Sequence, residues 1–404
     1  MPAADAADRS ATAPRYGQGW RKWGYLLSLL PPTLPLASYG LGLRSGHWDL
    51  AAFLTPVVYF LVIPVLDWLI GEDTSNPPEA EQRRLLQDRY YRLLTLACLP
   101  IYAAVLLFGA WVLANAPLSL IGAAGWVLSI GLVGGVTAIN TAHELIHKPG
   151  RLERWAGGAL LASVGYGSFR VEHIHGHHVD VATAADLSSA RLGETIYRFV
   201  PRSIWRNPQR ALELERAACA QRGLPWRPLT SELAGWTALS ALFALACMAV
   251  TALSPPTSPA ASDAAAAWWP GLVYFLGQGL VAISLLEIIN YVEHYGLVRE
   301  VVARDAATVR YERVNVRHSW NADFVLTNLL LFQLQRHSDH HAHPGRRYQA
   351  LRHFEESPRL PAGYAAMVVL AAIPPLWRRV MDPRVAACRT PPADSLSAAD
   401  PSGR

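Results

Sequence analysis

The 404-residue sequence predicts an all-α membrane protein: a six-helix transmembrane bundle with a cytoplasmic helical cap that carries a histidine-rich site. Three observations predict this fold class. Apolar residues, 51% of the chain against 17% charged, are concentrated in long runs. Lys and Arg lie almost entirely on one side of those runs. Eleven of the 14 histidines form four clusters on that same side. Six buried helices of a large soluble enzyme are the alternative, but the runs have the length of bilayer spans.

Six apolar runs are each close to the roughly 20 residues that cross a bilayer as a helix. The first two contain prolines, among them Pro31 and Pro64. Spanning helices tolerate proline because neighbouring helices can satisfy the freed carbonyl groups. The predicted spans are residues 23–43, 51–71, 93–115, 118–140, 235–254 and 270–290.

The distribution of basic residues predicts the orientation. An even number of spans places both termini on one side, and all but one of the 36 Lys and Arg residues fall on that side. The exception is Arg44. By the positive-inside rule, both termini and the segments 141–234 and 291–388 are cytoplasmic. Residues 1–22 lack the apolar core of a signal peptide, and we expect them to be partly mobile and the tail 389–404 to be mobile.

The histidine clusters are NTAHELIHK, VEHIHGHHVD, NYVEHYGL and LQRHSDHHAHP. In the first, His143 and His147 are four residues apart, which places both imidazoles on one face of a helix. The first and third clusters continue directly from predicted spans. We therefore expect all four to meet at the inner boundary of the membrane. The other members are His173, His175, His177 and His178, then His294, and finally His337, His340, His341 and His343.

The number of histidines favours a redox metal site. HELIH alone fits the HExxH motif of zinc proteases, so a membrane zinc metalloprotease is one alternative. Four ligands satisfy zinc, however, and this chain offers enough imidazole for two metals. Iron can activate O2, whereas zinc has no accessible redox step. A metal transporter or sensor is disfavoured because the histidines lie outside the bilayer centre. A redox pair beneath an apolar bundle points to oxidation of hydrocarbon C–H bonds.

These four boxes, in this order and spacing, resemble those of the integral-membrane non-haem di-iron alkane 1-monooxygenases (alkane ω-hydroxylases), within the membrane fatty acid desaturase/hydroxylase class. The resemblance covers roughly residues 20–385. It includes LDWLIGEDTSNPPE at 66–79 and PPLWRRVMDP at 374–383. Xylene-type methyl hydroxylases share a similar plan. A second possible function is therefore that of a related monooxygenase acting on aryl methyl groups or other hydrophobic substrates.

The resemblance implies two iron ions and terminal hydroxylation of medium- or long-chain n-alkanes with O2. It also implies residues that orient the ligands, and a large side chain at Tyr59 that could cap a substrate tunnel. Packing or interface anchoring is the other interpretation of Tyr59. The implied ligands are His143, His147, His173, His177, His178, His294, His337, His340 and His341. The implied orienting residues are Glu144, Glu172, Glu293, Asp339 and His343.

Electrons must come from another protein, because the chain has no flavin or nicotinamide fingerprint and its four cysteines form no CxxC pair. The resemblance implies rubredoxin, itself reduced by an NADH-dependent rubredoxin reductase, and a location in the bacterial inner membrane. No nucleic-acid partner is expected. Three arginines are candidate docking charges, although contacts with phospholipid headgroups would explain them equally well. They are Arg346, Arg347 and Arg352.

Overall fold

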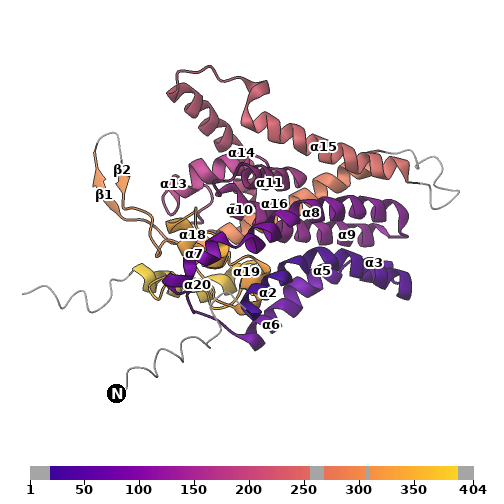
Figure 1. Cartoon of the computed structure of the whole chain (residues 1–404), viewed down its shortest axis with the longest axis horizontal. Helices are drawn as coiled ribbons and strands as arrows, with labels where there is room; N and C mark the ends of the chain where they lie inside the picture. The colour runs from indigo at the N-terminus through magenta and orange to yellow at the C-terminus, as the bar shows by residue number, and fades with distance from the viewer. Residues whose placement is uncertain (1–18, 255–267, 306–308, 390–404) are drawn as a thin grey trace, which may run out of the picture.

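The protein is described by a computed structural model, which places residues 19–254, 268–305 and 309–389. Long helices run side by side, and shorter helices gather at one end of them (Figure 1). The predicted all-α class is confirmed, since the only strands among the placed residues are β1 (Val301–Arg304) and β2 (Val309–Tyr311). These two strands form an antiparallel hairpin. The predictions for most of residues 1–22 and for the tail fall outside the described residues.

Among the described residues, five helical stretches are long and apolar enough to cross a membrane. A sixth apolar stretch, Leu54–Ile70, is shorter. It corresponds to the predicted span 51–71, so the count of six spans stays a prediction. The five long stretches are Trp20–Ser45, Arg89–Asn115 (α8), Leu120–Ile146, Glu232–Leu253 (α15) and Trp269–His294 (α16).

Three of the apolar stretches change their helical form along their length. The first contains two 3₁₀ turns where Pro31 and Pro32 lack the N–H groups that an α-helix needs. The others contain π-helical turns, in which one extra residue shifts the register of the side chains that follow. The segments are α2 (Trp20–Gly24), η1 (Tyr25–Leu29), η2 (Pro31–Thr33) and α3 (Leu34–Ser45); α5 (Leu54–Val57), η3 (Val58–Val62) and α6 (Ile63–Ile70); and α9 (Leu120–Val133), η4 (Gly134–Ile139) and α10 (Asn140–Ile146).

The shorter helices cover one end of the bundle, apart from α4 (Trp48–Ala51), which follows the first long stretch. Segments far apart in the chain meet at this end, among them α10, α13 and α18 (Figure 1). The remaining elements are α7 (Glu79–Gln87), α11 (Arg151–Ser163), α12 (Phe169–Glu172), η5 (His173–His177), α13 (His178–Asp180), α14 (Ile196–Gln221), η6 (Pro228–Thr230), α17 (Val325–Leu330), α18 (His337–Ala342), η8 (Tyr348–Ala350), α19 (Tyr364–Ala371) and α20 (Pro374–Arg389).

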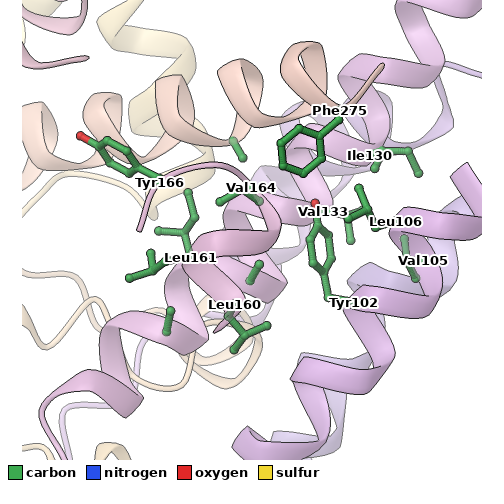
Figure 2. Packing of buried hydrophobic residues seen from close by; sticks show 14 of the residues in the cluster. Tyr102, Val105, Leu106, Ile130, Val133, Leu160, Leu161, Val164, Tyr166 and Phe275 are labelled. Atoms are coloured by element: carbon green, nitrogen blue, oxygen red, sulfur yellow. The ribbon is translucent and has the colours of Figure 1, made fainter. Parts of the chain in front are cut away.

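The main core lies where α8, α9, α11 and α16 meet. Figure 2 shows Tyr102 and Leu106 of α8 beside Val133 of α9 and Phe275 of α16. The Tyr102 hydroxyl donates to Gln278 Oε1 at 2.7 Å, so these polar groups are satisfied inside the apolar core. Large apolar side chains also cover the outside of the long helices, where Leu61, Leu93 and Leu242 are more than 60% exposed. A lipid environment explains that surface, and the chain is a multi-pass membrane protein.

Glycine allows α9 and α16 to approach closely. A Cβ atom at Gly131 would lie 2.6 Å from the backbone oxygen of Gln278. Gly40 in α3 has no such neighbour within 4 Å. We expect Gly131→Ala to lower the free energy of unfolding by on the order of 1–3 kcal/mol through overpacking. Gly40→Ala should instead be neutral or slightly stabilising. Thermal unfolding of the detergent-solubilised variants measures both, and equal midpoints would contradict this account of the packing.

Candidate metal centre

Nine histidines from all four boxes meet in two groups at the covered end of the bundle. Within each group the ligand nitrogens all lie within 4.8 Å of one another. Every predicted ligand belongs to one group, and His175 and His343 belong to neither. The larger group is His143, His147, His173, His178 and His340; the smaller is His177, His294, His337 and His341.

Local structure explains how each box presents its side chains. His143 lies in α10 and His147 at its C-terminal cap, one helical turn further on. His173 and His177 begin and end the π-helical turn η5. His294 is the last residue of α16, and α18 carries the fourth box. The two groups therefore combine helix ends that the apolar bundle brings together with segments from the covering helices.

The ring nitrogens face one another in a way that suits a bound metal. His178 Nε2 lies 3.0 Å from His173 Nε2 and 3.2 Å from His340 Nε2. In the other group, His337 Nε2 lies 3.2 Å from His294 Nε2 and 3.0 Å from His341 Nε2. Nitrogen ligands about 2.1 Å from a metal and at right angles are about 3.0 Å apart. The arrangement fits a metal centre in each group.

Burial keeps most of these imidazoles uncharged. It lowers the pKa of six histidines well below the ordinary value, and the neighbouring imidazoles lower it further. A neutral imidazole presents a lone pair, which is the form that binds a metal. The six are His147, His173, His178, His337, His340 and His341.

His177 differs because a carboxylate holds it. Its Nδ1 lies 3.0 Å from Asp186 Oδ2, and both side chains are buried. Burial alone would lower the pKa of His177, but the charge and hydrogen bond of Asp186 raise it. Ser189 Oγ and the backbone N–H of Ser188 donate to the same carboxylate. This bond leaves His177 Nε2, which has no hydrogen-bond partner within the described part of the chain, free to bind a metal.

Asp186 was not among the orienting residues predicted from the sequence. It lies in AADLSS, nine residues after His177, where no helical spacing connects the two. An acidic residue followed by two serines, shortly after a histidine box, was the available signal. Tyr364 was also missed. Its hydroxyl donates to Glu293 Oε1 at 2.7 Å, whereas Glu293 Oε2 lies 3.2 Å from His337 Nε2.

The five predicted orienting residues have different surroundings, and Glu293 is the one that contacts a histidine of the two groups. Glu144 pairs with the buried Lys148 at 3.0 Å. Glu172 is buried, its Oε2 atom has no hydrogen-bond partner among the described residues, and burial raises its pKa to about 8. Asp339 is buried and binds His343 at 3.1 Å. The predicted orienting roles stay predictions.

The three predicted docking arginines already hold buried carboxylates. Arg346 and Arg352 pair with Asp339, and Arg347 pairs with Glu153. Each side chain is less than 30% exposed. Their charges therefore stabilise the protein interior around the fourth box, and a docking role stays a prediction.

An apolar cavity leads to the histidines from within the bundle. It encloses an empty volume of about 850 Å³, counting the part that is open to the outside. Leu285 and Ile289 of α16 and Val368 of α19 line it, and Tyr59, the predicted tunnel residue, lies in its wall. At its polar end are His143, Asn140, Tyr364 and Glu293, the one carboxyl group in the lining. The cavity thus leads from hydrocarbon-like surroundings to His143 of the larger group, and to the smaller group only through Glu293, which contacts His337.

Comparison with known proteins identifies the family. The family model described as fatty acid desaturase matches residues 117–371. Alkane 1-monooxygenase 2 of Alcanivorax borkumensis is 46% identical over 371 residues, which cover 91% of each chain. The chain belongs to the alkane 1-monooxygenases. Alkane 1-monooxygenase 2 of Pseudomonas aeruginosa is 45% identical over 91% of this chain and 93% of that protein. The chain is also similar, more distantly, to the xylene/toluene monooxygenase hydroxylase component XylM of Pseudomonas putida, which is 28% identical over 63% of the chain.

The Asp186–His177 contact is directly testable. Asp186→Asn should lower metal affinity or activity about 10- to 100-fold, because the amide no longer fixes the ring of His177 by charge. Asp180→Asn is the matched control, since Asp180 pairs with Arg210 and contacts no histidine. Metal analysis of the purified variants measures the effect. Equal metal content and activity in both variants would contradict the positioning role.

Proposed function

We propose that this protein hydroxylates the terminal carbon of medium- or long-chain n-alkanes, using O2 and electrons from rubredoxin. One observation carries the proposal: an apolar cavity reaches two histidine groups, one directly at His143 and the other through Glu293 beside His337, in a chain 46% identical to an alkane 1-monooxygenase. The reaction consumes an alkane, O2, two electrons and two protons and yields a primary alcohol and water. We also propose that the histidine-bearing end faces the cytoplasm in a bacterial inner membrane, as the placement of Lys and Arg favours.

Two iron ions, one in each histidine group, would supply the redox step with O2 that no side chain can perform. The chain's own contribution is positional. Apolar walls of the cavity exclude water and hold an alkane lengthwise, so that the end of the substrate meets His143 and Glu293. Glu293 Oε1 accepts a hydrogen bond from the Tyr364 hydroxyl, which keeps this carboxyl group oriented between the cavity and His337.

Zinc proteolysis is disfavoured by the number of histidines that meet, since nine exceed the four ligands of a zinc site. Aryl methyl hydroxylation has one specific observation in its favour, the similarity to the XylM component. Graded n-alkanes and methylbenzenes offered to the same membranes, with products identified, separate the two substrate classes.

Replacement of a proposed ligand tests the centre. His340→Ala should abolish hydroxylation and lower iron content while membrane insertion is retained. His175→Ala is the matched control, because His175 is exposed, lies within the second box and belongs to neither group. Iron analysis and product formation from membranes with a rubredoxin system are the measurements. Full activity with full iron content in His340→Ala would defeat the assignment, and one zinc ion per chain in the wild type would favour a zinc enzyme.

The proposed tunnel role of Tyr59 predicts a change in substrate length. Tyr59 is 5% exposed and lines the cavity, whereas Leu61, two residues on, is 64% exposed. Tyr59→Ser should extend the longest alkane accepted, because it removes a ring from the cavity wall. Leu61→Ser should leave the range unchanged. Product profiles over alkanes of graded length decide, and an unchanged upper limit in Tyr59→Ser would reject the role.

A further inference from the structure

The proposed reaction needs two electrons per turnover, and the structure suggests where they enter. The argument therefore rests on the proposed function. The cavity approaches the histidines from the apolar bundle, where no soluble protein can reach. Among the nine histidines, His147 and His178 are the two that are not fully buried. Val179, directly after His178, is 61% exposed. Solvent therefore reaches the surface beside His178.

The β1–β2 hairpin is fixed to this surface. The backbone N–H of Arg299 donates to Ala182 O at 2.8 Å, and its Nη1 atom donates to Val179 O at 2.9 Å. The same guanidinium donates to Glu312 O on the returning side of the hairpin. Arg299 thus ties both sides of the hairpin to the residues after His178. Figure 1 shows the hairpin projecting from the covered end, away from the long helices.

The hairpin surface combines apolar side chains with unpaired positive charge. We define it as Val179 with the exposed valines and arginines of residues 298–317. Its valines are between 41% and 61% exposed. Its arginines are exposed and form no ion pair with any described residue, whereas Arg346, Arg347 and Arg352 are each paired. Residues 298–317 contain five arginines and three carboxylates, so the segment is net positive. The members are Val179, Val298, Val301, Val302, Val309, Arg304, Arg310, Arg313 and Arg317.

We propose that the hairpin surface docks an acidic one-electron carrier protein, which passes its electrons to the centre beside His178. A one-electron carrier must bind and leave twice per hydroxylation, so a small interface suits it better than a permanent one. An apolar patch among positive charges provides brief contact and attracts a negatively charged partner. The carrier is oxidised by one electron at each visit, and two visits supply the two electrons that one hydroxylation consumes, while the oxidised C–H bond supplies the other two that reduce O2.

Charge reversal on the hairpin tests the docking. In the full-length iron-loaded protein in membranes, Arg310→Glu with Arg313→Glu should raise the KM for reduced rubredoxin by on the order of tenfold, with kcat at saturation retained. Added salt should raise the KM for reduced rubredoxin far more in the wild type than in this variant, because the variant no longer carries the attractive charges. Arg198→Glu with Arg206→Glu is the matched control, because both arginines are exposed on α14 and form no ion pair with a described residue.

The neutral pair Arg310→Gln with Arg313→Gln should give an intermediate KM and provides a milder test of the same charges. An unchanged KM in both hairpin variants, or an increase confined to the α14 control, would overturn the proposal. A loss of iron with unchanged KM would assign the hairpin a structural role and would also overturn it. A wild type that forms no alcohol, whatever its KM, would instead refute the proposed function.

Discussion

Nine imidazoles in two groups, with ligand nitrogens within 4.8 Å of one another in each group and as close as 3.0 Å, set the central constraint on this protein. Charged imidazoles at that distance would repel one another strongly, so nearly all must be neutral together. Burial achieves this by making the protonated form unfavourable. His177 differs in that its Nδ1 faces the buried Asp186, which keeps its Nε2 available to a metal. The lone pairs of neutral imidazole nitrogens that lie this close together favour binding of a cation. The surrounding helices hold the histidine side chains in this position.

Buried ion pairs around the two histidine groups hold the neighbouring segments in place. Asp339 binds two arginines, Glu153 binds Arg92 and Arg347, and Glu144 binds Lys148. Arg336, next to the first histidine of its box, donates to the backbone oxygens of Ser75 and Leu351. These bonds join the fourth box to segments far away in the chain. Removing one partner of such a pair would leave a buried charge uncompensated, which is costly. The histidines are therefore held by a network that extends well beyond their own helices.

The sequence predicts features that come from repeated residue types, such as apolar runs and histidine boxes. It does not predict contacts between segments that are far apart in the chain. Long apolar runs located the helices, and four histidine boxes sharing one side located the centre. The shortness of Leu54–Ile70 was missed because hydropathy averages over residues and does not detect the turn at residues 52–53 that separates this stretch from α4. The contacts of Asp186 and the carboxylate partners of the three arginines were not predicted, because they depend on how the folded segments pack and not on spacing along the chain. The hairpin escaped because its strands are short and exposed on both faces, so they show no alternation of apolar and polar residues.

The order of the boxes along the chain has a consequence for biogenesis. Each histidine group takes members from both the middle of the polypeptide and the segment around residues 337–341. A nascent chain that has already inserted every long helix still lacks three of the nine side chains, because the ribosome adds them last. Both histidine groups can therefore be completed only after translation of nearly the whole polypeptide. A product truncated before residue 337 would keep the long apolar helices yet lack one histidine of the larger group and two of the smaller.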